Sequence, residues 1–237
     1  MAKETLVYNL ERQLERKLAV HESDLLNAHL SFVLEKNKNI NLTRIGSYDE
    51  GTLLHIEDSL TAFREVMKAP DGELADIGSG AGYPGIPLAI VSGRKTTLIE
   101  SIGKKAAILE EFIKSYNLVN SIKVEGKRTE EVAYTQKNKF SVITARAVSE
   151  LPALVELAAP LLAPGGLFIA YKGSPSSEEI ERGATAAKKV GLTEEESRTF
   201  CLSDNFTERT IIVYRKTHEA DIILPRRPGI AQKRPLA

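Results

Sequence analysis

The chain has 237 residues, which is enough for one α/β domain and an additional element at one end. Its 42% hydrophobic and 27% charged residues are typical of a folded globular protein and argue against extensive disorder. Lysine plus arginine and aspartate plus glutamate both number 32, and this zero net charge argues against a protein that coats nucleic acid without specificity.

Other features of the composition predict the compartment. The single cysteine, Cys201, excludes an internal disulfide and a zinc site built from cysteines. The charged N-terminal segment lacks the apolar core and cleavage site of a secretory signal, and no apolar run is long enough to span a bilayer. We therefore expect a cytoplasmic protein that binds neither a metal ion nor a membrane.

Residues 1–68 are predicted to form a helical region. Leucines recur at every fourth position from Leu6 to Leu18, which places them on one face of a first helix. Ser23-Asp24 are suitable caps for a second helix, and a third is expected over residues 49–67. The sequence APDG at 69–72 breaks the helical pattern and predicts a domain boundary.

Strand-like and helix-like segments alternate over residues 69–217. The apolar runs LADIG, TTLIES, SIKVEG, FSVITAR and GLFIAYK are separated by helical stretches, which is typical of a parallel sheet covered on both faces. ESRTFCL and RTIIVYRK predict a closing antiparallel pair at the sheet edge. We expect an α/β fold with a doubly wound, mainly parallel seven-stranded sheet, followed by a basic, proline-containing tail over 218–237 that forms a loop or an extended arm.

The strongest chemical feature is the sequence LADIGSGAGYPG, in which a strand enters a glycine-rich turn and then a helix. Gly78, Gly80 and Gly82 follow the spacing of the loop that binds S-adenosylmethionine in methyltransferases. Gly80, Gly82 and Gly85 also satisfy the dinucleotide fingerprint. Glu100, at the end of the next strand and followed by Ser101, suits the ribose hydroxyls of an adenosine in either case.

Three features favour S-adenosylmethionine over a nicotinamide dinucleotide. Asp76 precedes the first glycine, where a carboxylate can face the positively charged methionine end of the cofactor. Pro84 and Pro87 at the start of the following helix remove backbone donors that a pyrophosphate would use. The sequence APGGLFIAYKG before a late strand is a pattern that many methyltransferases share.

The motifs NLTRI, HIEDSL, DIGSGAGYPGIPLAI, ESIGKKAAILE, TARAVSELPALVELAAPLL, AYKG and PRRPGI together resemble the bacterial 16S rRNA guanine-N7 methyltransferase G family, also called glucose-inhibited division protein B. The resemblance runs through nearly the whole chain. It implies a class I, Rossmann-like fold and methylation of N7 of one guanine, at position 527 in the standard small-subunit rRNA numbering. It implies S-adenosylmethionine binding, with S-adenosylhomocysteine as product, at Gly78, Tyr83, Thr129, Glu130 and Arg146.

The sequence departs from this family at two places. The acid that ends the second strand is usually Asp in the family and is Glu100 here. The tail continues GIAQK, where family members more often carry Pro and Asn.

The sequence lacks the motifs that methylation of other base atoms requires, which fits methylation at guanine N7. Guanine N7 has an accessible lone pair, so methyl transfer needs alignment and no base. The fourth strand ends in TARAV and not in the Asn/Asp-Pro-Pro-aromatic turn used on exocyclic amines, and Cys201 lies away from the position of a cytosine-C5 nucleophile. Arg146, at the end of that strand, is the candidate catalytic residue; the alternative is a surface salt bridge.

Several other residues allow two interpretations each. Thr129 and Glu130 can border the adenine or begin a helix with Thr129 as its cap. Tyr83 can lie near the methionine moiety or in the core. Lys172 can contact phosphate or extend over the sheet edge. His55, Asp58 and Ser59 lie on one helical stretch without a strand-to-helix elbow, so a catalytic triad is rejected in favour of a His55–Asp58 hydrogen-bonded pair.

The basic residues of the tail suit a mobile arm that grips RNA phosphates: Arg226, Arg227, Lys233 and Arg234. We expect a monomer whose partner is 16S rRNA, within the small ribosomal subunit or its precursor. Two alternatives remain: a methyltransferase of small molecules or proteins on the same fold, and a non-catalytic S-adenosylmethionine-binding protein associated with RNA.

Overall fold

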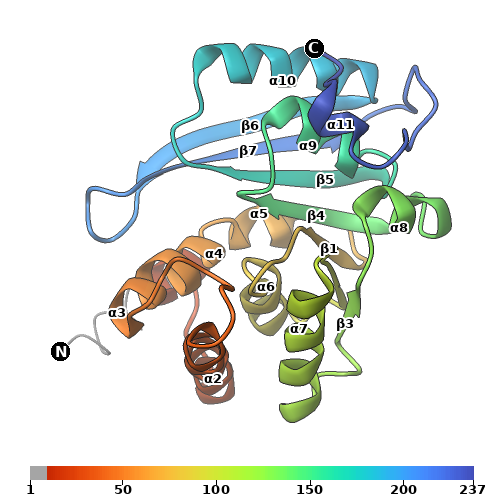
Figure 1. Ribbon diagram of the computed structural model, residues 1–237. Coiled ribbons are helices and arrows are strands. Elements are labelled where there is room, and N and C mark those ends of the chain that lie inside the picture. Colours follow the sequence, from red (N-terminus) through yellow and green to blue (C-terminus); the bar gives the residue numbers. More distant parts are fainter. Residues whose placement is uncertain (1–9) are drawn as a thin grey trace.

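The computed structural model describes residues 10–237 and contains one seven-stranded sheet with the order β3-β2-β1-β4-β5-β7-β6 (Figure 1). The pairs among the first five strands are parallel, and the two pairs made by β7 are antiparallel. The strands are β1 (Leu74–Ile77), β2 (Thr96–Ile99), β3 (Ile122–Glu125), β4 (Phe140–Arg146), β5 (Leu162–Lys172), β6 (Leu192–Cys201) and β7 (Glu208–Lys216). The predicted mainly parallel sheet with its antiparallel edge is confirmed.

The strand order reverses between β1 and β4. β1 lies beside β2 on one side and beside β4 on the other, with Asp76 level with Leu98 and Thr144. In open α/β sheets the point of reversal opens a crevice at the carboxyl ends of the strands, and ligands bind there. The loops that follow β1 and β4 therefore flank one crevice.

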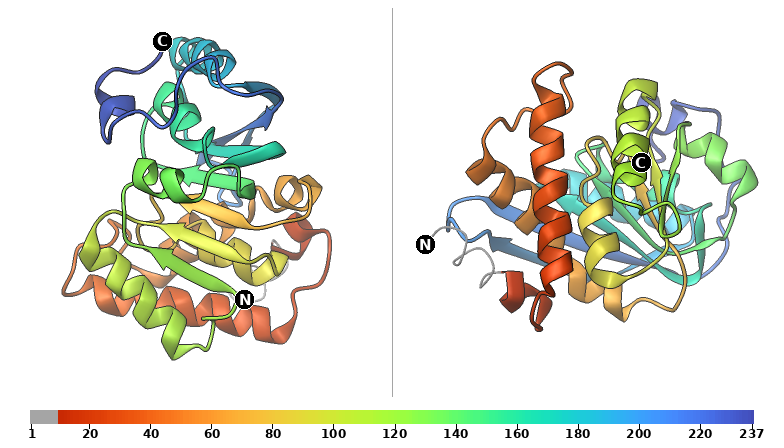
Figure 2. Two further views of the ribbon diagram at one scale, coloured as in Figure 1. Left: turned by 90° about the vertical axis from the view of Figure 1, so that its right-hand side faces the viewer. Right: turned by 90° about the horizontal axis from the view of Figure 1, so that it is seen from below.

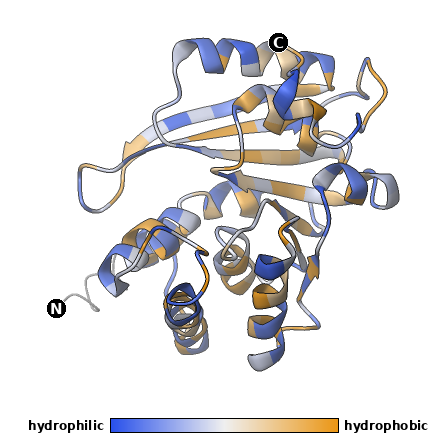
Figure 3. Cartoon of the chain, in the orientation of Figure 1, coloured by the Kyte–Doolittle hydropathy of each residue, from blue (hydrophilic) through white to orange (hydrophobic). Residues whose placement is uncertain are grey.

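Helices cover both faces of the sheet (Figures 1 and 2). One core cluster joins the central strands to the helices on the first face, which are α8 (Thr129–Thr135), α9 (Leu151–Ala158), α10 (Ser177–Lys189) and α11 (Ile230–Lys233). The opposite face carries the N-terminal helices together with α5 (Phe63–Lys68), α6 (Gly85–Ser92) and α7 (Gly103–Ser115). Hydrophobic residues concentrate along the central strands, whereas α10 is largely hydrophilic along its length (Figure 3).

The N-terminal region differs in detail from the sequence prediction. Residues 10–14 are helical and bury Leu10 and Leu14, whereas Leu6 lies outside the described residues. The next helix, α2 (Val20–Asn37), begins before the predicted Ser23-Asp24 cap, because the Glu22 carboxylate accepts a hydrogen bond from the Ala19 backbone N–H at 2.9 Å. A paired guanidinium stabilises this start, since both Arg16 terminal nitrogens donate to Glu22.

The predicted third helix is broken into shorter pieces. They are α3 (Tyr48–Gly51), the π-helical turn η1 (Thr52–Glu57), α4 (Asp58–Leu60) and α5. π-Helical turns re-aim side chains and are frequent at functional sites; here the turn carries His55 and ends immediately before Asp58. Leu30 and Leu60 share one core cluster with sheet residues such as Ile169, so the boundary near residue 69 remains a prediction.

The C-terminal tail is docked, which corrects the expectation of a mobile arm. α11 packs on α9, and the Arg226 guanidinium forms an ion pair with the buried Glu156 of that helix. Arg182 of α10 donates to the backbone oxygen of Ala237 at 3.2 and 3.1 Å. The apolar residues between the basic ones explain the docking, because Ala231 is 1% exposed and joins the core cluster on this face.

Candidate functional site

The glycine loop leaves β1 at the crevice. Gly78, Gly80 and Gly82 have positive φ values of 67°, 57° and 92°, a region that disfavours side chains. At Gly82 a close approach also excludes a side chain, because an added Cβ would lie 2.6 Å from Ile86 Cδ1 and 2.9 Å from His29 Nε2. At Gly80 the space is open, since among the described residues only the Gly78 oxygen would come within 4 Å of an added Cβ, at 3.8 Å. The loop therefore leaves room for a ligand beside Gly80.

Glu100, at the end of β2, is joined to this loop. One carboxylate oxygen accepts from the Gly80 N–H at 2.9 Å, and the other accepts from the Ile102 N–H at 2.7 Å. A carboxylate oxygen has two lone pairs, so each retains acceptor capacity for a ribose hydroxyl. The neighbouring Ser101 is exposed. The structure thus brings together the predicted loop and the predicted ribose acid.

Asp76 does not have the open position expected from the sequence. Its side chain is 0% exposed and accepts hydrogen bonds from the Thr144 hydroxyl at 2.8 Å and from the Gly85 N–H at 3.2 Å. Burial raises the pKa of Asp76 to about 6, although these hydrogen bonds and the Arg146 charge oppose the shift. The carboxylate fastens the glycine loop and the start of α6 from beneath and does not face the crevice.

Thr129 and Glu130 begin α8, beyond β3. The helix cap is Arg128, whose backbone N–H donates to Glu131 at 2.8 Å, so Thr129 is not the cap that the sequence suggested. The Glu130 carboxylate accepts from the backbone N–H of Gly229 at 2.7 Å. The docked tail therefore reaches the edge where the adenine is expected. The two residues in contact, Glu130 and Gly229, are 99 residues apart in the chain.

Tyr83 links the glycine loop to the N-terminal helices. Its ring stacks on His55 with centroids 4.2 Å apart and planes 3° apart, and the centroid of the His29 ring of α2 lies 4.4 Å away. His29 also contacts the loop through Nε2, which lies 2.9 Å from the Ala81 carbonyl oxygen. Sequence reasoning missed His29, because its spacing on α2 is that of an ordinary core residue.

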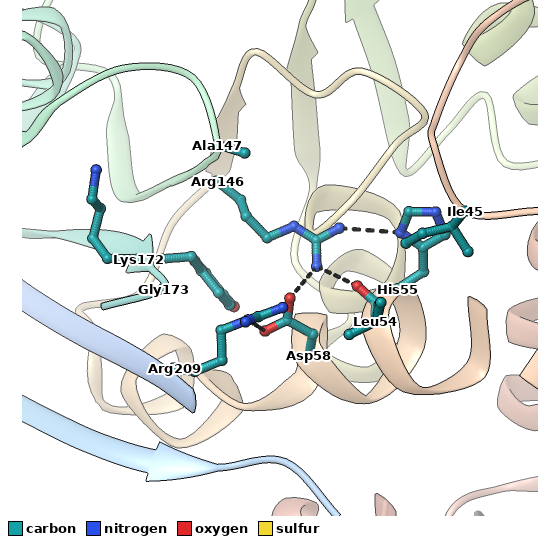
Figure 4. A pocket seen from close by; sticks show the side chains of 10 residues that line it. Ile45, Leu54, His55, Asp58, Arg146, Ala147, Lys172, Gly173 and Arg209 are labelled. Carbon is teal, nitrogen blue, oxygen red and sulfur yellow. Dashed lines mark hydrogen bonds and ion pairs between the residues drawn. The ribbon is translucent and has the colours of Figure 1, made fainter. Parts of the chain in front are cut away.

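A cavity of about 400 Å³ lies at the ends of β4 and β5 (Figure 4), and two of its lining residues, His55 and Arg146, lie against the Tyr83 ring. Its lining residues are Ile45, Leu54, His55, Asp58, Arg146, Ala147, Tyr171, Lys172, Gly173 and Arg209. The N-terminal helical region contributes the first four, and the ends of β4, β5 and β7 contribute the rest together with Ala147 and Gly173, which directly follow β4 and β5. Ala147, next to Arg146, has a φ of 56°, an uncommon conformation for a non-glycine residue that occurs often at functional sites.

Arg146 is fixed at the centre of this cavity. One terminal nitrogen donates to Asp58 at 2.8 Å and to the Leu54 carbonyl at 3.0 Å, and the side chain is 14% exposed. The guanidinium also lies 5.8 Å from the centroid of the Tyr83 ring. Asp58 is buried, so this is not the surface salt bridge that the sequence left open as an alternative.

His55 does not pair with Asp58 as the sequence suggested. Its Nδ1 lies 3.5 Å from a terminal nitrogen of Arg146, which only donates, so Nδ1 accepts and Nε2 carries the proton toward the Thr43 hydroxyl at 3.2 Å. Burial, together with the charge of Arg146, lowers the pKa of His55 to about 3. The imidazole is therefore neutral at physiological pH.

The predicted RNA-binding cations occupy two different settings. Lys172 is paired with Glu179 at 2.6 Å, and Arg226 is paired with Glu156, so both contribute to packing. Arg227, Lys233 and Arg234 are exposed on the docked tail.

Burial of two histidines predicts an acid-sensitive fold. Burial lowers the pKa of His29, like that of His55, to about 3, so both rings stay neutral in the folded state while the unfolded chain protonates them near pH 6.5. Their contribution to stability is complete above pH 6.5 and is lost as the pH falls toward 3. Asp76 acts in the opposite direction between about pH 4 and 6, because the folded state holds its proton there.

We therefore expect His29→Gln to flatten the pH dependence of the free energy of unfolding. The difference between the original protein and the variant should shrink by ~1.4 kcal/mol per pH unit from pH 6 to pH 4, the slope for one proton. Urea unfolding at several pH values measures it, with His21→Gln, which removes an exposed imidazole, as the control. Parallel profiles for the original protein and His29→Gln would contradict the assignment.

Two kinds of feature are absent from residues 10–237. No group of three or more His, Cys, Asp or Glu side chains in this range is placed to hold a metal ion. In the same range no helix combines the length and the apolar character needed to cross a membrane.

Known sequences similar to this chain are rRNA methyltransferases. The family model described as rRNA small subunit methyltransferase G matches residues 22–211. A ribosomal RNA small subunit methyltransferase G from Limosilactobacillus reuteri (strain DSM 20016) is 38% identical over 213 residues, which cover 88% of each chain. A protein of the same name from Carboxydothermus hydrogenoformans is 37% identical over 215 residues, covering 90% of this chain and 91% of the relative.

Solved structures share the fold at lower identity. An O-methyltransferase from Bacillus cereus, in complex with SAH, aligns with a TM-score of 0.57 and 22% identity over 80% of this chain and 91% of that chain. A SAM-dependent O-methyltransferase from Thermotoga maritima aligns with a TM-score of 0.53 and 14% identity over 79% and 72%. These likenesses confirm the expected Rossmann-like fold of class I methyltransferases.

Proposed function

The chain belongs to the rRNA small subunit methyltransferase G family, and from this premise we propose that it transfers the methyl group of S-adenosylmethionine to N7 of one guanine, position 527 in the standard numbering, in 16S rRNA. One observation carries the proposal: the glycine loop after β1 and the arginine-centred cavity after β4 meet at the switch point of the sheet, with Tyr83 between them. A donor site and an acceptor site are thereby adjacent.

The residues at the crevice fit the cofactor. The open space beside Gly80 admits a ligand against the backbone, and Glu100 has acceptor capacity left for the ribose hydroxyls. The remaining proposed cofactor residues line the same edge, although Asp76 acts from beneath the loop: Asp76, Gly78, Gly82, Tyr83, Ser101, Thr129, Glu130 and Arg146. When bound, the cofactor supplies an electrophilic methyl group on its sulfonium.

The chain's own contribution to the reaction is positioning. Guanine N7 is already an acceptor with a free lone pair, so no side chain has to remove a proton. The cavity matches this requirement, because His55 is neutral with both nitrogens engaged and Asp58 is bound to arginines. We assign to Arg146 the orientation of the base or the cofactor from a site that leaves N7 itself free.

RNA is attracted by local charge in a chain of zero net charge. Arg227, Lys233 and Arg234 are exposed on the tail, which is docked beside α8 and the start of the cofactor edge. Basic groups held on one side of a neutral protein give salt-dependent binding. We propose that the enzyme acts as a monomer in the cytoplasm on the small subunit or its precursor.

Transfer of tritium from labelled cofactor tests the function against its alternatives. The substrates are small subunits from a strain that lacks this gene, the naked 16S rRNA extracted from them, and a total protein and metabolite fraction. We expect label in 16S rRNA. Label confined to protein or small molecules would instead identify a different methyltransferase, and cofactor binding without any transfer would identify a non-catalytic RNA-associated protein.

A further inference from the structure

Asp58 holds two arginines that come from different strands (Figure 4). One carboxylate oxygen accepts from Arg146 of β4 at 2.8 Å, and the other accepts from Nε of Arg209 of β7 at 3.0 Å. The Asp58 side chain is 3% exposed, so the two guanidiniums meet on a buried anion. Such a carboxylate fixes the orientation of both cations more firmly than a surface pair would.

The charges in this cluster do not balance. Asp58 carries one negative charge against two guanidiniums, while the nearby Lys172 is neutralised by Glu179 at 2.6 Å. The residues that line the half-enclosed cavity therefore carry more positive than negative charge, although the buried Asp76 near Arg146 offsets part of the excess. A cavity with low-dielectric walls and an excess of positive charge attracts an anion.

Arg209 is the member of the pair with donors to spare. Its Nε binds Asp58 and one terminal nitrogen donates to the Glu208 carbonyl at 2.9 Å, whereas its other terminal nitrogen has no partner among residues 10–237. The side chain is 21% exposed and lines the cavity. A guanidinium that is anchored through Nε and one terminal nitrogen, and whose second terminal nitrogen is available at a cavity wall, suits a phosphate oxygen.

The place of Arg209 in the sheet separates it from the cofactor. β7 lies three strand positions from β1, across β4 and β5, which is roughly 14 Å at the usual strand spacing. The glycine loop follows β1, so an anion at Arg209 is on the acceptor side of the crevice. In an RNA substrate the anions are backbone phosphates.

We propose that Arg209 binds a backbone phosphate of the substrate RNA beside the target guanine, and that Asp58 is a positioning residue that orients Arg209 and Arg146 together. The proposal rests on the function proposed above and adds a substrate contact to it. In this arrangement Arg146 orients the base or the cofactor, and Arg209 holds the RNA backbone. The buried Asp58 carboxylate fixes the position of one guanidinium relative to the other.

Arg209→Gln tests the phosphate contact while keeping most of the side-chain length. Filter binding of small subunits at several salt concentrations should show the slope of log affinity against log salt reduced by about one, because one phosphate contact is lost. The KM for subunits should rise roughly ten- to a hundredfold with little change in kcat. Arg209→Lys should keep the salt slope and raise KM less.

Arg215→Ala is the matched control, because it comes from the same strand but pairs with the exposed Glu195 at the other end. It should leave the salt slope and KM unchanged. Suppose that the original protein methylates subunits and that Arg209→Gln has the same salt slope and the same KM. This result would overturn the phosphate contact and would leave the proposed function intact. An original protein without salt-dependent RNA binding or transfer would instead overturn the proposed function.

Asp58→Asn tests the positioning role. The variant keeps the side-chain shape but loses the charge that holds both guanidiniums, so the KM for subunits should rise as in Arg209→Gln and kcat should fall at least tenfold. If Asp58 acts through Arg209, Asp58→Asn should add little further rise in KM in the Arg209→Gln background, whereas a merely structural defect would add its full effect. An Asp58→Asn variant that folds with unchanged KM and kcat, or whose effect on KM is fully additive with Arg209→Gln, would show that Asp58 does not act through the two arginines.

Discussion

Arg146→Ala should lower kcat for methyl transfer at least a hundredfold, because misplacement of reacting groups by about 1 Å is sufficient for a loss of this size. The substitution removes the donor to Leu54 and Asp58 and the cation that lies over Tyr83. The cofactor loop and the substrate cavity would lose the side chain that contacts both. Single-turnover transfer to small subunits measures the loss directly.

Arg146→Lys distinguishes geometry from charge. Lysine retains the positive charge but has no planar fork, so it cannot face Asp58, Leu54 and His55 at once. We expect this variant to keep the melting temperature and to recover only part of the activity. Unchanged turnover in Arg146→Ala would remove Arg146 from the mechanism.

The second large effect is expected at the glycine loop, where Gly80→Ala should weaken binding of S-adenosylhomocysteine at least tenfold. Among residues 10–237 an added methyl group meets only the Gly78 oxygen, at 3.8 Å, so the protein itself has space for it. The methyl group would instead occupy the space in which we expect the bound ligand to lie, and this clash weakens binding. Calorimetric titration of the folded variant measures the change.

Gly93→Ala is the matched control for this variant. Gly93 has a φ of 68°, close to the 57° of Gly80, and an added Cβ there would meet no atom of residues 10–237 within 4 Å. Both substitutions therefore carry the same backbone strain, about 1 kcal/mol of stability. Equal cofactor affinity in the two variants would show that the ligand does not lie against Gly80.

Much of the fold can be predicted from the sequence, because the patterns that indicate its strands, turns and helices lie within a few residues of one another. The buried strand LADI, the glycine turn and the apolar start of α6 follow one another within a few residues, and the sheet arises from repetition of this unit. Local signals failed where a distant group decided the outcome. The tail is docked because Arg226 pairs with the buried Glu156, 70 residues away in the chain. The earlier start of α2 at Val20 is a different case, because the nearby Glu22 and Arg16 cap the helix and a pattern of cap residues alone does not show which of several candidates is used.

The candidate site was predictable in its cofactor half and much less so in its substrate half. Gly80 and Glu100 each follow a strand end, so the topology alone brings them together. Asp58 meets Arg146 and Arg209 from 88 and 151 residues away, and a π-helical turn directs it there. Neither the turn nor the partners has a periodic pattern, which is why Arg209 escaped the sequence analysis and Asp58 was assigned to His55.

The most direct test of the account is the chemical location of the transferred methyl group. Small subunits methylated by the purified protein are extracted, and the 16S rRNA is treated with borohydride and aniline, which cleave the chain at N7-methylguanine. The account predicts one new cleavage, at guanine 527, that requires S-adenosylmethionine and is lost in Arg146→Ala. Methyl label in 16S rRNA without cleavage at that guanine would contradict it.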